Sequence, residues 1–184
     1  MTSYCQYCNA HPEDILNRTY HDLIYGFPLD DDDLLFERFV LEINQAGLSW
    51  ITILKKAEHF RRAYDGFAVE TVAAYGEPDR ARLLADAGII RNRLKVDAAI
   101  ENARRILKLR KEYGSFKGWL DAHHPLDLEE WTELFKKNFV FTGGEIVREF
   151  LISTGYLPGA HDADCPIFAR VAKLSPAWME PPRP

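Results

Sequence analysis

The chain lacks any long hydrophobic segment. None of its apolar runs approaches the roughly 20 residues that a membrane-spanning helix needs. Its start, from Met1 to Cys5, has neither the basic nor the apolar stretch of a secretion signal. These absences predict a cytoplasmic protein without a membrane partner. Hydrophobic residues make up 47% of the 184 residues and charged residues 28%, which excludes global disorder.

Cysteine is also scarce. The chain has three, Cys5, Cys8 and Cys165. An odd number in a chain without a secretion signal argues against a disulfide framework. The thiols are therefore either metal ligands or free and buried.

Strand patterns are close to absent, and apolar residues recur at helical spacing, so we predict an all-α protein. The acids Asp30 to Asp33 can cap a helix that stops at Gly47, and a second helix runs from Trp50 toward Ala63. A helix ending at Gly155 follows a capping box formed by Thr142 and Glu145. Other helices are predicted over 69–75, 80–87, 117–122 and 128–137, and through the run from Val96 to Leu107.

No internal repeat or low-complexity block divides the chain, so we expect residues 1–180 to form a single domain. Residues 181–184 look like a flexible tail. Between about 80 and 110 the pattern is helix, tight turn, helix.

Charge is distributed unevenly. The formal net charge of −5 argues against a nucleic-acid partner, but one segment is strongly basic. The basic residues between positions 89 and 111 are Arg91, Arg93, Lys95, Arg104, Arg105, Lys108, Arg110 and Lys111. The turn from Gly88 to Lys95 can present backbone N–H groups and basic side chains to a DNA phosphate. The alternative is a solvated basic turn.

Possible metal ligands lie near both ends of the chain. His161 and Cys165 are four residues apart, and Cys5, Cys8, His11 and His21 lie near the start. Two such pairs from distant segments are typical of a zinc site that clasps the termini. For either pair alone, a buried thiol and surface histidines are the simpler interpretation.

Glu42 lies within an otherwise apolar helical segment. A carboxylate there is solvated, hydrogen-bonded or functional. Tyr20, Tyr25 and Trp50 could line a pocket that stacks a flat ligand, or they could be ordinary core residues.

Four motifs occur in an order that closely resembles the 3-methyladenine DNA glycosylase I family, the zinc-containing helix-hairpin-helix glycosylases. They are Tyr20-His21-Asp22, the run Leu41-Glu42-Ile43-Asn44-Gln45-Ala46-Gly47-Leu48-Ser49-Trp50 with its continuation to Lys56, the hairpin Ala87 to Lys95, and His161-x3-Cys165. They span most of residues 4 to 167.

The resemblance implies a structural Zn²⁺ held by His21, His161, Cys165 and a fourth ligand. Cys8 has the spacing of the family, but we favour Cys5 because its neighbours match. The resemblance also implies that Glu42 and Tyr20 hydrogen-bond an extruded base and that Trp50 stacks on it, and Tyr25 stands where the family has tryptophan. Gly88, Arg91, Arg93 and Lys95 would contact double-stranded DNA.

The implied activity is hydrolysis of the N-glycosidic bond of alkylated purines, chiefly 3-methyladenine, by a monomeric base-flipping enzyme of base-excision repair. Because the methylated base is already cationic, Glu42 would bind it rather than protonate it. No lysine lies in a motif that suggests a Schiff-base lyase. The alternatives are a non-catalytic zinc-stabilised DNA-binding protein and a helical interaction protein without a nucleic-acid role.

Overall fold

The computed structural model describes residues 2–180. Within that part of the chain every regular element is a helix, and no strand is present. The predicted all-α class is confirmed. Among the described residues, no helix is long and apolar enough to cross a membrane. The predicted tail, 181–184, lies outside the described residues.

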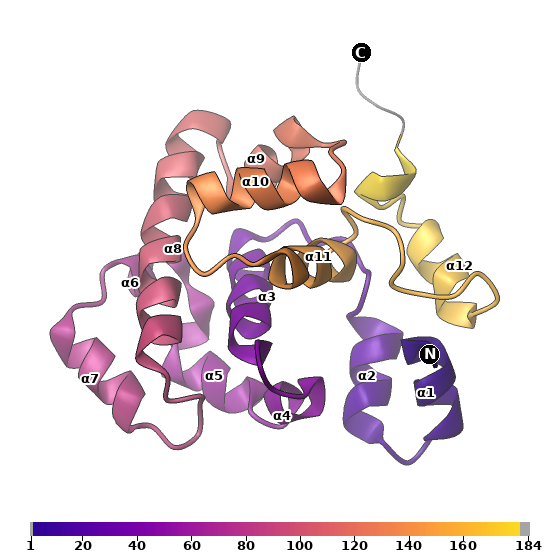
Figure 1. Ribbon diagram of the computed structural model, residues 1–184, viewed down its shortest axis with the longest axis horizontal. Helices are drawn as coiled ribbons and strands as arrows, with labels where there is room; N and C mark the ends of the chain where they lie inside the picture. Colours follow the sequence, from indigo (N-terminus) through magenta and orange to yellow (C-terminus); the bar gives the residue numbers. More distant parts are fainter. Residues whose placement is uncertain (1, 181–184) are drawn as a thin grey trace.

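The helices follow one another through short connections (Figure 1). Those of the first half are α1 (Tyr4–Ala10), α2 (Ile15–Leu23), α3 (Asp32–Gln45), α4 (Trp50–Leu54), α5 (Ala57–Ala63), the 3-10 turn η1 (Asp65–Phe67), α6 (Val69–Ala73) and α7 (Glu77–Ala85). Those of the second half are α8 (Arg93–Tyr113), α9 (Phe116–His123), α10 (Leu128–Asn138), α11 (Gly144–Ser153), α12 (Pro166–Ala172) and the 3-10 turn η2 (Ala177–Met179).

Helix α3 runs through the centre of the molecule (Figure 1). Its start is fixed by Asp31, whose carboxylate accepts hydrogen bonds from the N–H groups of Asp33 and Leu34 at 2.8 and 3.0 Å. The helix ends before Gly47, which adopts a left-handed conformation with φ of +80° that favours glycine. Both ends agree with the sequence prediction.

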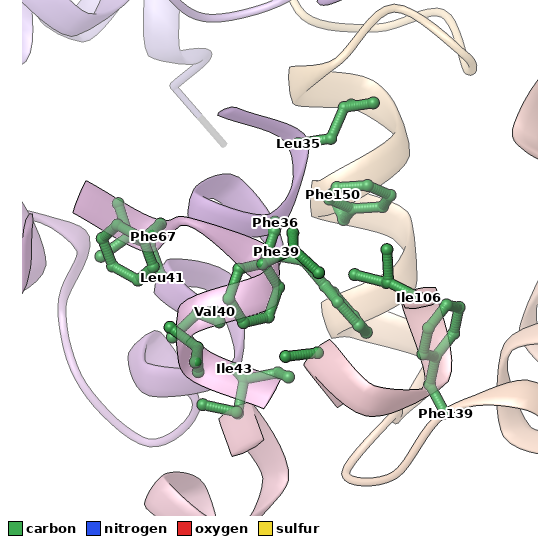
Figure 2. Close-up of a cluster of buried hydrophobic side chains, with 14 of the residues drawn as sticks. Leu35, Phe36, Phe39, Val40, Leu41, Ile43, Phe67, Ile106, Phe139 and Phe150 are labelled. Carbon is green, nitrogen blue, oxygen red and sulfur yellow. The ribbon is translucent and has the colours of Figure 1, made fainter. Parts of the chain in front are cut away.

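The main core surrounds α3. Figure 2 shows Phe36, Phe39 and Ile43 of α3 close to Phe150 of α11 and Ile106 of α8. All five side chains are almost fully buried. This packing fixes α3 against α8 on one side and α11 on another, and the functional side chains come from the ends and edges of these helices.

The helices nearest the two ends of the chain, α1 and α12, lie on the same side of the molecule (Figure 1). Helices α1 and α2 lie beside the segment that leads into α12, opposite the side formed by α6, α7 and α8 (Figure 1). Across this junction the Oγ of Ser3 hydrogen-bonds the Asp162 carboxylate, and Arg170 donates to the carbonyl oxygen of Asp22 at 3.1 Å.

Two helix predictions are wrong in detail. Residues 50–63 form two helices because the N–H of Lys56 bonds the carbonyl of Ile53 at 2.9 Å and tightens the chain into a turn. Thr142 does not cap α11. The N-cap is Gly143, without a side-chain hydrogen bond, so the predicted capping box is absent from this described helix. The sequence patterns also did not predict the helices α1, α2 and α12.

Candidate functional site

Glu42 lies near the C-terminal end of α3, at the wall of a cavity. Its side chain is 4% exposed. Among residues 2–180 its carboxylate has neither a hydrogen-bond partner nor an ion-pair partner. Burial raises the pKa of Glu42 from 4.5 to about 8, Arg38 opposes this rise, and Glu149 and Glu145 add to it. The carboxylate therefore lines the cavity rather than the outer surface, and among the described residues no hydrogen bond or ion pair compensates its burial.

Aromatic rings stand beside Glu42. Tyr20 of α2 and Trp50, the first residue of α4, have ring centroids 5.0 Å apart. Tyr25, in the loop after α2, lies 5.5 Å from Tyr20 and 5.5 Å from the edge-on ring of Tyr4. The structure thus brings together the four residues predicted to form a base site: Glu42, Tyr20, Tyr25 and Trp50.

The side chain of Arg38 holds Tyr20 in this aromatic wall. Its guanidinium donates to the Oη of Tyr20 at 3.3 Å and to the carbonyl oxygen of Ser153 at 3.4 Å. Its charge also lies 5.2 Å from the centroid of the Tyr20 ring. The phenol at this wall is therefore held in place rather than free to rotate.

The cavity has a volume of about 270 Å³. At roughly 30 Å³ per water molecule, this is the space of about nine waters, enough for a two-ring heterocycle. Its walls are formed by Tyr4, Tyr20, Tyr25, Glu42, Gln45, Trp50, Glu145 and Glu149.

Four of the eight wall residues, Tyr4, Gln45, Glu145 and Glu149, were not predicted from the sequence. Glu145 and Glu149 are four residues apart on α11 and therefore share one helix face. That spacing was visible in the sequence, but only the packing of α11 against α3 shows that the face meets Glu42. Tyr4 carried no recognisable signal, and Gln45 lies in the motif from Leu41 to Trp50 but was given no role of its own.

The predicted metal ligands lie together at the junction of the chain ends. One ligand atom from each of Cys5, His21, His161 and Cys165 lies within 4.8 Å of the others, and all four residues are buried. Cys8 is buried on the same helix as Cys5 but does not belong to this group. The geometry therefore agrees with the choice of Cys5 over Cys8.

The donor set fits a tetrahedral ion. Bonds of about 2.0 Å to nitrogen and 2.3 Å to sulfur require donor separations of roughly 3.3 Å between nitrogens and 3.5 Å between sulfur and nitrogen. The Nε2 of His21 and the Nδ1 of His161 are 3.3 Å apart. Cys5 Sγ lies 3.2 and 3.7 Å from these two nitrogens, and Cys165 Sγ lies 3.8 and 4.0 Å from them.

The second nitrogen of each ring has its own partner. His21 Nδ1 lies 2.6 Å from the carboxylate of Asp22, and His161 Nε2 lies 2.8 Å from the carbonyl oxygen of Tyr25. Such partners fix the ring orientation and leave the inward nitrogen free to bind a metal. Tyr25 thus connects the cluster to the cavity.

The predicted hairpin joins α7 to α8. Asn92 caps α8 by accepting the N–H of Lys95 at 3.2 Å. The first N–H groups of such a long helix point out of its end and attract anions. Arg91 and Arg93 are exposed beside it, and Arg93 has a loose ion pair with Asp97 at 3.8 Å.

Gly88 is required by close packing in the hairpin. A Cβ atom at this position would lie 2.7 Å from the ring of His59 and 2.9 Å from Asp86. Lys56, from the turn before α5, donates to the carbonyl oxygens of Ala87 and Gly88 at 3.0 and 3.1 Å. The loop is therefore held from the side opposite the exposed arginines.

The prediction that Lys95 contacts DNA needs correction. Its side chain is buried, and its Nζ donates to the carbonyl oxygens of Asn44 and Ala46 at 2.8 and 2.7 Å. An ammonium group committed to the C-terminal end of α3 does not reach a phosphate.

Other members of the basic segment are also committed within the fold. Arg104 donates to the carbonyls of Ala73 and Tyr75, and Arg110 pairs with Asp32. The basic surface is therefore smaller than the sequence suggests.

Together, the fold and the site define a helix-hairpin-helix protein with an acidic pocket walled by aromatic rings. Residues 9–130 match the family described as methyladenine glycosylase. A DNA-3-methyladenine glycosylase 1 from Escherichia coli is 36% identical, over 86% of this chain and 94% of the relative. A DNA-3-methyladenine glycosylase from Haemophilus influenzae is 34% identical, over 90% and 98%.

Solved structures agree. A 3-methyladenine DNA glycosylase I variant in complex with 3-methyladenine superposes with a TM-score of 0.76 at 32% identity, covering 87% of this chain and 96% of that one. The Staphylococcus aureus 3-methyladenine DNA glycosylase I has a TM-score of 0.78 at 32% identity, covering 90% and 97%. The chain belongs to the methyladenine glycosylase family.

Proposed function

We propose that this chain, a base-excision-repair glycosylase of alkylated adenine, binds the extruded base in the pocket around Glu42 and hydrolyses its bond to the sugar. The observation that carries this proposal is the buried carboxylate of Glu42 in the cavity wall, which among residues 2–180 has no hydrogen bond or ion pair, although the charge of Arg38 acts on it. A base methylated at N3 carries the missing positive charge. Its approach lowers the pKa of Glu42, so that the carboxylate form binds it.

The reaction needs little acid catalysis. Water adds to the anomeric carbon as the bond from that carbon to the base breaks, and the bonding electrons neutralise the positive ring. The proton of the attacking water passes to solvent. Glu42 and Tyr20 orient the base, and the rings of Trp50 and Tyr25 provide surfaces for stacking. No side chain is required as a nucleophile, so the enzyme is a monofunctional hydrolase.

The hairpin is proposed to hold the DNA backbone. The N-terminal end of α8, with Gly88 and the exposed Arg91 and Arg93, can bind a phosphate of duplex DNA without reading its sequence. Lys95 is excluded from this role because its ammonium is buried.

The Cys/His cluster is proposed to hold a structural Zn²⁺. Cys5 and His21 from one end of the chain, with His161 and Cys165 from the other, supply two thiolates and two imidazoles. A zinc ion supplies a charged crosslink between these segments when bound. The four residues orient each other at the junction that also carries Tyr25, and so support the pocket wall.

The test is release of 3-methyladenine from methylated duplex DNA, with the freed bases identified by chromatography. We expect Glu42→Gln to keep the fold and the binding of undamaged DNA while slowing excision by roughly 30- to 1000-fold, because it removes an ionic contact in a water-poor pocket. Glu133→Gln, which removes one exposed charge on α10, is the control. Excision by Glu42→Gln at the wild-type rate would contradict the proposed role of Glu42.

A further inference from the structure

The cavity has a second acidic wall besides Glu42. Helix α11 contributes Glu145 and Glu149 to it, while Glu42 comes from α3. The two glutamates of α11 differ in their surroundings. The side chain of Glu145 is 72% exposed, whereas that of Glu149 is 25% exposed. Glu149 is therefore the carboxylate of this wall that a bound ligand would desolvate.

Glu149 is held in one orientation by two neighbours. Its Oε2 accepts a hydrogen bond from the Oη of Tyr25 at 3.2 Å. Its Oε1 pairs with Arg148 at 2.5 Å. An ionised carboxylate has about four acceptor sites, so these two contacts leave Glu149 able to accept from a ligand in the cavity.

Positive charge does not cancel the acidity of the pocket. Arg148 is shared between Glu149 and Glu145, which it contacts at 2.9 Å. Arg38 is committed to Tyr20 and Ser153. Three carboxylates thus face two guanidinium groups, of which Arg148 is paired with Glu145 and Glu149 while Arg38 is bonded to Tyr20 and Ser153. Burial raises the pKa of Glu149, and Arg148 opposes this rise.

We propose that Glu149 is a second recognition carboxylate of the pocket, which together with Glu42 makes the site selective for bases that carry a positive charge. The inference rests on the proposed function, because it assumes that the base occupies this cavity. It assigns to α11 a specificity-determining role, because two carboxylates that line the same cavity favour a cation over a neutral base.

The test compares two ligands that differ in charge. The 3,9-dimethyladeninium ion stays positive across neutral pH, whereas 9-methyladenine, which lacks the N3 methyl group, is neutral, so each variant is compared with the wild type on the same ligand. Their dissociation constants would be measured by titration calorimetry for the wild type and for Glu149→Gln. The glutamine keeps an acceptor for Tyr25, and Arg148 keeps Glu145 as its partner.

We expect Glu149→Gln to weaken binding of the cation by about tenfold and to change binding of the neutral base by less than about twofold. Glu133→Gln controls for net charge, because it removes one exposed negative charge on α10 that does not line the cavity, and it should leave both constants unchanged. Equal effects on the two ligands, or no effect on either, would overturn the proposal.

Tyr25→Phe separates charge recognition from positioning. It removes the hydrogen bond to Glu149 but leaves the charge. If Tyr25→Phe lowers the preference for the cation as much as Glu149→Gln does, Glu149 acts only by holding Tyr25, and the proposal is wrong. Melting curves of each variant identify loss of fold.

The assay also distinguishes failure of this inference from failure of the proposed function. If the wild type does not release 3-methyladenine from methylated DNA, the proposed function fails. If it does so, and Glu149→Gln retains the full preference for the cation, only the role of Glu149 is wrong.

Discussion

The ammonium group of Lys95 lies 2.8 Å from the main-chain carbonyl oxygen of Asn44. Asn44 follows Glu42 by two residues on α3, and Lys95 lies in the first turn of α8, directly after the hairpin. One buried side chain therefore joins the proposed DNA anchor to the helix that carries Glu42, the proposed base-binding carboxylate. A cation at the C-terminal end of α3 also interacts favourably with the helix dipole.

Replacing this side chain should destabilise the protein. We expect Lys95→Met to lower the free energy of unfolding by about 1–3 kcal/mol, because the carbonyls of Asn44 and Ala46 lose a buried donor. Urea denaturation measures this change. Lys108→Met, on the exposed face of the same helix, should have little effect. A stability of Lys95→Met equal to the wild type would show that the contact is not formed in solution.

Arg91 and Arg93 of the hairpin should contribute equally to the affinity for every DNA duplex. We expect the double replacement of Arg91 and Arg93 by Gln to weaken binding to damaged and undamaged duplexes by the same factor. If both contact phosphates, the slope of log affinity against log salt falls by about 2. Fluorescence anisotropy over a range of salt concentrations checks this. The pair Lys108 and Lys111, at the far end of α8, supplies the matched control. Unchanged affinity at low salt would contradict anchoring by the hairpin.

The sequence predicts the central helices well because their signals are local. Asp31 caps α3, Gly47 ends it, and apolar residues recur along one face. Helices α1 and α12 are harder to predict because they have only seven residues each and belong to a small second core cluster, with Cys5, Cys165, Ile167 and Val171, instead of the main core. Their stability depends on contacts between the chain ends, which local spacing does not reveal.

The site was predictable where its residues lie in motifs that resemble the family. Glu42 and the four cluster residues, Cys5, His21, His161 and Cys165, fall where the resemblance implies. Lys95 and Glu149 show the limit. A basic residue in a basic turn gives no sign that it points inward, and an acidic residue on an amphipathic helix gives no sign that a cavity lies beside it. Both roles depend on packing between helices.

The choice of the fourth metal ligand gives a further prediction. Protein purified without added metal should contain one zinc per chain, which elemental analysis measures. We expect Cys5→Ala to lose the metal and to lower the melting temperature by on the order of 10 °C, because the crosslink between the chain ends is lost. Cys8→Ala should keep the metal, since Cys8 lies outside the cluster. Normal metal content in Cys5→Ala together with loss of metal in Cys8→Ala would show that Cys8, and not Cys5, is the fourth ligand.

Binding of a cationic base should depend on pH through Glu42. Because its pKa is raised to about 8, Glu42 is largely protonated in the free enzyme at pH 7. A cation binds the carboxylate form, so binding below pH 8 releases a proton. The affinity for 3,9-dimethyladeninium should therefore rise by up to about tenfold per pH unit from pH 6 and level off above pH 8.

The control for this pH dependence is Glu42→Gln, which cannot release the proton and should show a weaker affinity that changes little over the same range. Glu149 and Glu145 on the facing helix, and Arg38 beneath the pocket, are the other charged groups that act on Glu42. Glu149→Gln should shift the midpoint to lower pH, since Glu149 raises the pKa of Glu42. Calorimetry in buffers of different ionisation enthalpy counts the released protons directly. An affinity of the wild type that does not change between pH 6 and 8 would show that Glu42 is already ionised before the base enters.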